Sequence, residues 1–494
     1  MLRVNSTTAG LLVAMFATGT VAMSQPAALS QIPPDSEIQK ILTDRIDKYG
    51  QSVGIVVGII DPQGQRVVAH GQLDQGDSRP LNGDTVFEID SITKVFTGLL
   101  LTDLVARGEV ALTDRVAKYL PSELKVPERG GRQITLLDLA THFSGLPDLP
   151  LNAPLFEQAP IGNYTAEQLY SMLSAYHLDS DPGAQYFYSN VGFGLLGHAL
   201  ARRAGVDFER LLETRITGPL GMSDTRITPT PQMMERFATG HSYYRLTPTP
   251  ALDYGVLAGA GGLRSTANDL LRLLGACMGY TKTPLARAAS AMIETRRPTG
   301  DLGVDVGLGW FIQAPNRCGR SGCEPMGLQF VVHAGGSFGY ASYLAYDPKS
   351  RVGVVVLSNA SHHVDVGDIG RHVLNSQFPI LGPKQLEFSK RRKDAERQTG
   401  MPVDTKLLDA YAGHYKGSSE TWVVRQEGAR LFMQDEAHLN RGYMKYEIIP
   451  KNAQEFVFLG QDSEVRFDNI RQGRSSGLIL YDEDGSTKRF RRVD

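Results

Sequence analysis

Cysteine is scarce in this chain, and the spacing of the few cysteines argues against a metal centre. Only three occur in 494 residues. Cys318 and Cys323 are separated by four residues, and no second cysteine pair or nearby His-x-x-x-His motif completes a tetrahedral set of zinc ligands. We therefore predict no metal site and no cofactor. In an oxidising compartment the two cysteines would either close a small disulfide hairpin or remain free thiols, whereas Cys277 is predicted to be buried and unpaired.

An excess of either charge is also lacking. The chain has 51 Lys and Arg residues against 53 Asp and Glu residues, for a net charge of -2. The one short basic run, 390–393, is interpreted as part of a solvated linker. The sequence therefore lacks the excess of basic residues that is typical of nucleic-acid-binding proteins. A hydrophobic share of 41% is enough for large cores, and the length exceeds that of one ordinary domain.

The N-terminus lacks an apolar run long enough to form a stable membrane span. Arg3 precedes the apolar stretch 9–17, and the small residues Ala22 and Ser24 follow. This pattern is typical of a secretory signal peptide, which we place at residues 1–24. Polar residues follow too soon for a membrane helix, and no lipobox cysteine stands near it. We predict a mature chain that begins near Gln25 and is periplasmic or secreted.

Ser91 and Lys94 stand one helical turn apart, directly after the apolar run 86–89. The apolar residues 95–101 predict a buried helix, and Ser91 is therefore expected at the N-terminus of that helix. Free backbone amides and the helix dipole favour developing negative charge at that position. The spacing therefore predicts a serine nucleophile with a candidate base on the same face.

Tyr188 and Asn190 form the second motif. They are two residues apart, so in an extended loop both side chains would point to one side. A phenol near an ammonium group can lose its proton below its usual pKa of about 10, so Tyr188 is predicted to be a general base that titrates together with Lys94. The Asn190 amide can donate to a substrate carbonyl and accept from Lys94.

The third motif is His333-Ala334-Gly335, followed by Gly336, at the end of the strand-like run 328–332. Glycine here would let a bound acyl group lie close to the strand backbone. We predict that His333, Gly335 and Gly336 contact the substrate.

An alternative nucleophile overlaps this motif. Residues 335–339 fit G-x-S-x-G, the nucleophile elbow of α/β-hydrolases, with Ser337 at its centre and Asp365 and His372 downstream. That elbow requires a strand before the serine and a helix after it. The alternating pattern over 340–346 predicts a strand instead, which disfavours this alternative.

The three motifs occur in this order, with flanking segments at 134–147, 219–222 and 307–310. Together they resemble the penicillin-recognising serine hydrolases, in the branch of class C β-lactamases, D,D-carboxypeptidases, D-aminopeptidases and related esterases. The resemblance covers about residues 36–385. It implies that Ser91 is the acylated nucleophile, that Lys94 and Tyr188 transfer protons and that Asn190 positions the substrate. It also implies an oxyanion hole formed by the backbone amides of Ser91 and Gly336.

His333 departs from the Lys-Thr-Gly motif of many relatives. A lysine keeps its charge at neutral pH and binds a substrate carboxylate, whereas a free histidine with a pKa of about 6.5 is mostly neutral there. We therefore predict that activity on carboxylate-bearing substrates weakens as pH rises through the pKa of His333.

The remaining pattern predicts an α/β fold in which an antiparallel sheet is flanked by helices and a helical lobe. A helix at 38–46, a hairpin over 53–69 and strands at 328–358 would form the sheet layer, with a mainly helical middle from about 90 to 300 and a cleft between the two parts. Residues 386–405 read as a linker. Short strands over 406–494 predict a small all-β barrel that resembles the lipocalin-like extensions of some β-lactamase-related hydrolases.

The sequence thus predicts a secreted serine hydrolase with a Ser91 acyl-enzyme. The favoured function is a D,D-carboxypeptidase/endopeptidase or β-lactamase-like amidase that acts on D-amino-acid-containing peptides or β-lactams. A carboxylesterase of the same fold is the first alternative. A penicillin-binding sensor or scaffold that acylates once is the second. A small-molecule or peptide substrate is the partner that these readings share.

Overall fold

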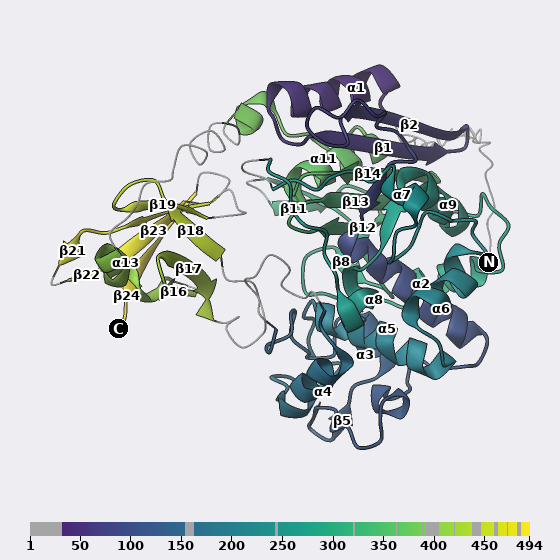
Figure 1. Ribbon diagram of the computed structural model, residues 1–494, viewed down its shortest axis with the longest axis horizontal. Coiled ribbons are helices and arrows are strands. Elements are labelled where there is room, and N and C mark those ends of the chain that lie inside the picture. Colours follow the sequence, from purple (N-terminus) through teal and green to yellow (C-terminus); the bar gives the residue numbers. More distant parts are fainter. Residues whose placement is uncertain are drawn as a thin grey trace, which may run out of the picture.

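The computed structural model places the chain in two units, a large mixed domain and a small barrel beside it (Figure 1). The residues it describes are 32–153, 163–242, 246–319, 322–361, 363–387, 390, 405–418, 420–436, 446–458, 463–471, 473–481 and 486–494. The predicted signal peptide 1–24, most of the predicted linker 386–405 and the basic run at 391–393 lie outside these ranges. None of the described helices is long and apolar enough to cross a membrane.

The large domain is built on an eight-stranded antiparallel sheet in the order β2-β1-β14-β13-β12-β9-β8-β7. The strands are β1 Gly54–Asp61, β2 Gly64–Gly71, β7 Arg297–Pro298, β8 Val304–Val306, β9 Phe311–Gln313, β12 Phe330–Gly336, β13 Ala341–Asp347 and β14 Val352–Ser358. The N-terminal hairpin pairs with β14 in a register that sets Ile55 opposite Ser358. The two ends of the domain therefore share one sheet, as the sequence predicted.

Helices cover both faces of this sheet, because successive strand residues point to opposite sides. In β1, Val56 packs into the core beneath the helical lobe, whereas Ile55 and Val57 pack into a second core beneath α1 (Asp35–Thr43) and α11 (His363–Leu374). The 3₁₀ and π-helical segments are η1 Asp44–Lys48, η2 Asp90–Ile92, η3 Val116–Tyr119, η4 Glu213–Thr217 and η5 Gly255–Leu257. The other helices of this domain are α2 Thr93–Ala106, α3 Leu136–Ala140, α4 Ala166–Ala175, α5 Asn190–Ala204, α6 Phe208–Leu212, α7 Pro231–Met234, α8 Ala258–Gly261, α9 Ala267–Cys277 and α10 Ala286–Glu294.

Helices α5 and α9 each begin at a residue whose side-chain hydroxyl caps the helix. The Ser189 hydroxyl accepts from the Gly192 amide and so begins α5, and the Thr266 hydroxyl accepts from the Asp269 amide and begins α9. Cys277, at the end of α9, is a free thiol as predicted, but it is half-buried where the sequence predicted a buried residue.

Strands β7 to β9 correct the expectation that strands return only at residue 328. Each has two or three residues, too few to show a period-2 pattern in the sequence. Three further two-stranded sheets are also short: β3 Val86–Glu88 with β6 Arg264–Thr266, β4 Glu128–Arg129 with β5 Arg132–Gln133, and β10 Asn316–Gly319 with β11 Gly322–Pro325.

The C-terminal unit is a closed antiparallel barrel, as the spacing of its short strands predicted. Its strands are β15 Gly413–Lys416, β16 Thr421–Glu427, β17 Arg430–Asp435, β18 Tyr446–Pro450, β19 Glu455–Phe458, β20 Glu464–Phe467, β23 Gly477–Tyr481 and β24 Thr487–Arg492. Helix α13 (Thr405–Tyr411) precedes it, and the small hairpin β21 Ile470–Arg471 and β22 Arg474–Ser475 projects from it. The ring of Tyr411 stacks on Phe467 at 4.3 Å within a core of buried aromatic and aliphatic side chains. The described part of the barrel is therefore filled by its own side chains.

Candidate active site

Ser91 lies where the chain turns from strand β3 into helix α2. It is the second residue of η2, which runs directly into α2. Almost every residue of α2 is buried, so the helix is anchored on all sides and holds its first turn in place. Ser91 itself is partly exposed, as a nucleophile must be. The predicted position at a helix start is confirmed.

Lys94 is fully buried, and its ammonium group has three acceptors. Nζ lies 2.9 Å from Ser91 Oγ, 2.6 Å from Asn190 Oδ1 and 2.7 Å from the carbonyl oxygen of Ala260. Two of these partners are oxygens that can only accept. If Lys94 loses one proton, its two remaining N–H bonds stay with those oxygens and its lone pair faces Ser91.

Tyr188 and Asn190 flank the cap of helix α5 and reach the same centre. The Tyr188 hydroxyl donates to Ser91 Oγ at 3.0 Å, and the Lys94 ammonium lies 4.9 Å from the centre of the Tyr188 ring. Between them, Ser189 donates to the carbonyl of Pro147 and so fixes the start of α5. The structure therefore brings together the four polar residues of the first two predicted motifs.

Asp148 is a member of this network that the sequence analysis missed. It accepts from Asn190 Nδ2 at 2.7 Å, and its backbone carbonyl accepts from the amides of Asn190 and Val191. One hydrogen of the Asn190 amide is thus committed to Asp148, so only the other can reach a substrate. Asp148 follows the flanking segment 134–147, but a single acid after a proline carries no recognisable signal. The Ala260 carbonyl is likewise invisible in the sequence, because it is a backbone group.

Strand β12 brings the third motif beside Ser91. A Cβ on Gly335 would overlap the carbonyl oxygen of Ile89 and would lie 3.1 Å from the backbone nitrogen of Ser91. Only glycine therefore allows β12 to approach Ser91 this closely. His333 is buried on the same strand, with Nδ1 2.7 Å from the carbonyl oxygen of Ala334 and its ring 5.5 Å from that of Phe311.

Burial sets the protonation of Lys94 and Tyr188. It lowers the pKa of Lys94 to about 7, against the opposing influence of Asp148 and Asp90. Burial also raises the pKa of Tyr188. The expectation that Tyr188 loses its proton below its usual pKa is therefore wrong for the free enzyme. The desolvated Lys94 amine is the stronger candidate for the base, and the Tyr188 hydroxyl stays a donor.

His333 also departs from the expectation. Burial, followed by the nearby charge of Lys94, lowers its pKa to about 3. The imidazole is therefore neutral throughout the physiological pH range and loses no charge between mildly acidic and mildly alkaline pH. This removes the predicted weakening of activity on carboxylate-bearing substrates through titration of His333.

The α/β-hydrolase alternative fails on structure. Ser337 lies in a turn between strands β12 and β13, where a nucleophile elbow would require a helix after the serine. His372 lies on α11 and contacts the carbonyl of Phe378 and the carboxylate of Glu37 instead.

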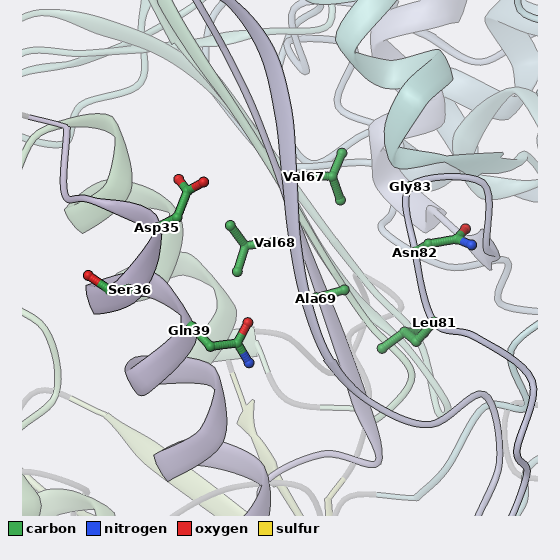
Figure 2. Close-up of a pocket in the computed structure, with 9 residues that line it drawn as sticks. All are labelled: Asp35, Ser36, Gln39, Val67, Val68, Ala69, Leu81, Asn82 and Gly83. Atoms are coloured by element: carbon green, nitrogen blue, oxygen red, sulfur yellow. The ribbon is translucent and has the colours of Figure 1, made fainter.

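A separate surface groove follows the open edge of the sheet. Figure 2 shows it along the edge strand β2, with α1 on one side and residues Leu81, Asn82 and Gly83 on the other. None of the motif residues lines it. Within the described part of the chain, no group of three or more His, Cys, Asp or Glu residues is arranged to hold a metal ion.

Comparisons with known proteins agree with this geometry. The sequence model of the family described as Beta-lactamase matches residues 42–376. The chain is 32% identical over 341 residues to the D-alanyl-D-alanine-carboxypeptidase/endopeptidase AmpH of Escherichia coli (strain K12). This alignment covers 65% of this chain and 84% of AmpH. It is 26% identical over 450 residues to Penicillin-binding protein 4* of Bacillus subtilis (strain 168), covering 87% of this chain and 93% of that protein.

Solved structures share the fold of the large domain. A Beta-lactamase/D-alanine Carboxypeptidase from Yersinia pestis, complexed with citrate, aligns with a TM-score of 0.58 at 27% identity and covers 69% of this chain and 96% of its own. A class C beta lactamase from Rhodobacter sphaeroides aligns with a TM-score of 0.58 at 26% identity, over 68% of this chain and 98% of its own. With the family match over more than half of its length, the chain belongs to the beta-lactamase family of serine hydrolases.

Proposed function

We propose that this protein is a secreted or periplasmic hydrolase that cleaves amides of D-amino-acid-containing peptides or β-lactams through an acyl-enzyme on Ser91. The observation that carries the proposal is the pair of contacts on one partly exposed hydroxyl: Lys94 Nζ at 2.9 Å and Tyr188 Oη at 3.0 Å from Ser91 Oγ. A serine becomes a nucleophile when an adjacent group takes its proton. The similarity to AmpH, a D-alanyl-D-alanine-carboxypeptidase/endopeptidase, supports the peptide substrate.

The geometry supports the following reaction. The neutral Lys94 amine takes the proton of Ser91, whose Oγ bonds to the substrate carbonyl carbon. The resulting oxyanion accepts from the backbone amides of Ser91 and Gly336. The C–N bond then breaks, the leaving nitrogen takes a proton from Tyr188, and Tyr188 is reprotonated by Lys94. These transfers return Lys94 and Tyr188 to their starting states. In a second half-reaction water bonds to the acyl carbon, and its proton passes through Lys94 to Ser91 Oγ as the ester C–O bond breaks, which frees Ser91 and the acid product.

A carboxylesterase is the second candidate, and the state of His333 favours it. The imidazole is neutral, and the rings of Phe311, His142 and Tyr188 lie around it and the nucleophile. Such a lining suits an uncharged acyl group as well as a peptide that ends in a carboxylate.

The test is incubation of purified protein with a fluorescent penicillin, in parallel with the S91A and S337A variants. We expect covalent label in the wild type and in S337A, none in S91A, and a labelled peptide that contains Ser91 in the mass spectrum. Label that persists indicates a peptidase or a penicillin sensor, and label that clears with released product indicates a β-lactamase. An unlabelled enzyme that hydrolyses p-nitrophenyl esters through Ser91 would be an esterase. Label retained by S91A would overturn the proposal.

A further inference from the structure

Asp90, the residue before the nucleophile, has a strained backbone. Its φ is +46°, in the left-handed region that residues with a side chain seldom adopt. Glycine occupies this region without a steric penalty, and aspartate does so with a smaller penalty than most residues. Asp90 is joined directly to Ser91. Its backbone conformation therefore sets the direction of the chain after strand β3 and, with it, the orientation of Ser91. Strain of this kind persists where the surroundings enforce it, often at active sites.

The side chain of Asp90 adds a second unfavourable feature. It is fully buried, and its Oδ2 has no hydrogen-bond partner among the described residues. The Tyr254 hydroxyl approaches Oδ1 only at 3.5 Å. Burial, together with the nearby carboxylate of Glu88, raises the pKa of Asp90 well above its ordinary value. A buried acid without full hydrogen bonding lowers the stability of the fold, so packing alone gives no reason for an aspartate here.

What Asp90 faces gives that reason. The Ser337 hydroxyl interacts with its carboxyl group, and Ser337 directly follows Gly336 on the facing strand. Two further contacts hold the same turn against this part of the sheet. A Cβ on Gly335 of β12 would lie 3.1 Å from the backbone nitrogen of Ser91, and Ser342 Oγ of the neighbouring strand β13 donates to the carbonyl oxygen of Ile89 at 3.0 Å. Asp90 therefore stands at the junction between the turn that carries Ser91 and the end of β12.

We propose that Asp90 is a positioning residue for Ser91, whose carboxyl group holds the nucleophile turn against the Gly336–Ser337 end of β12 so that the Ser91 and Gly336 amides converge on one acyl oxygen. The inference rests on the proposed acyl-enzyme function and deepens it. It also gives Ser337, which is excluded as a nucleophile, a role in the site.

The test compares D90G, D90N and S337A with the wild type. The probe is a fluorophosphonate, which reports on a serine nucleophile whatever its natural substrate. Lys94 takes the Ser91 proton, an Oγ–P bond forms, the P–F bond breaks and fluoride leaves. We expect the labelling rate of D90G to be at least about tenfold lower than that of the wild type. Without the carboxyl group, the Ser91 and Gly336 amides would no longer be held in position to bind the oxyanion. At the same time D90G should melt at a higher temperature, because glycine relieves the backbone strain and removes the buried acid. A residue with only a structural role would not separate rate from stability in this way.

D90N is the conservative variant. Asparagine tolerates the left-handed region and keeps an acceptor oxygen for Ser337, so we expect its labelling rate to stay near that of the wild type. S337A should slow labelling. The D90G/S337A double variant should be no slower than D90G alone, because the two substitutions remove the same interaction.

R351G is the matched control. Arg351 also has a positive φ, of 56°, but it lies in the turn that joins β13 to β14, at the end of β13 away from Ser337. Its labelling rate should not change.

The outcomes separate the two proposals. Labelling of the wild type that survives S91A would overturn the proposed function. Serine-dependent labelling that D90G leaves unchanged would overturn only the role of Asp90, as would a D90G variant that loses rate and stability together while D90N fails to restore either. Additive losses in D90G and S337A would show that the two residues act separately, and would also overturn it.

Discussion

At the scale of single residues, Lys94 gives the sharpest prediction. Its pKa of about 7 means that the amine is protonated below pH 7 and free above it. A group that acts as a base only when unprotonated makes the acylation rate rise with pH up to its pKa and level off beyond it. We therefore expect the second-order rate constant for Ser91 acylation to increase about tenfold per pH unit below pH 7. In K94R the guanidinium stays protonated, so the rate should fall by about 10² or more at every pH. A pH-independent rate in the wild type would contradict this assignment.

Asp148 supports a second prediction. Its carboxylate, with a pKa raised to about 6 by burial, stabilises the protonated form of Lys94. Replacing Asp148 by asparagine removes that charge, so Lys94 should lose its proton more easily. The midpoint of the pH–rate profile should then move to lower pH by about one unit. The maximal rate should fall by about tenfold, because Asn190 loses a charge-assisted hydrogen bond. A midpoint that moves to higher pH would show that Asp148 does not act on Lys94.

The site residues that could be predicted from sequence are those whose side chains carry the chemistry in a fixed spacing. Ser91 and Lys94 lie on one helical turn, and Tyr188 and Asn190 lie on either side of a helix cap, so the local backbone alone brings each pair together. The rest depends on burial and on tertiary contacts. The protonation of Tyr188 and the neutral state of His333 follow from desolvation, which no motif reveals.

At the scale of elements, the hairpin of β10 and β11 brings two cysteines into register. Cys318 and Cys323 are direct partners across this antiparallel pair. Cα atoms of such partners lie about 4.5 or 5.5 Å apart, within the range of about 4.4–6.8 Å that a disulfide bridges. We expect protein from an oxidising compartment to yield a non-reduced peptide spanning 316–325 that is lighter by two hydrogens. Cys277, the free thiol, is the internal control. Alkylation of all three cysteines without reduction would contradict the disulfide.

Elements differed in how well the sequence revealed them. Long buried strands such as β1 and β14 are continuous apolar runs, and helix α9 carries its own cap, so each was predictable locally. Strands β7 to β9 exist because β9 pairs with β12, a contact between distant segments. Their few residues have no pattern of their own. Tertiary pairing decides such strands, and a local analysis misses them.

At the scale of the whole molecule, the two units have separate cores. Among the described residues, the two hydrophobic clusters on either side of the large sheet include none beyond Ile380, and the members of the barrel cluster fall within 407–490. Every residue of the candidate site, from Asp90 to Ser337, belongs to the large domain.

This separation predicts that the large domain works alone. A variant that ends at Lys390 should fold and should be labelled at Ser91 by the fluorescent penicillin at the rate of the full chain, because it keeps both sheet cores and all site contacts. Calorimetry of the full chain should show two unfolding transitions, since domains with independent cores unfold as separate cooperative units. The transition that disappears in the truncated variant should belong to the barrel, and S91A should change neither the number of transitions nor their order. If truncation abolishes labelling while the remaining transition keeps its temperature, the barrel contributes to the site itself, and the independence argued from the cores is wrong.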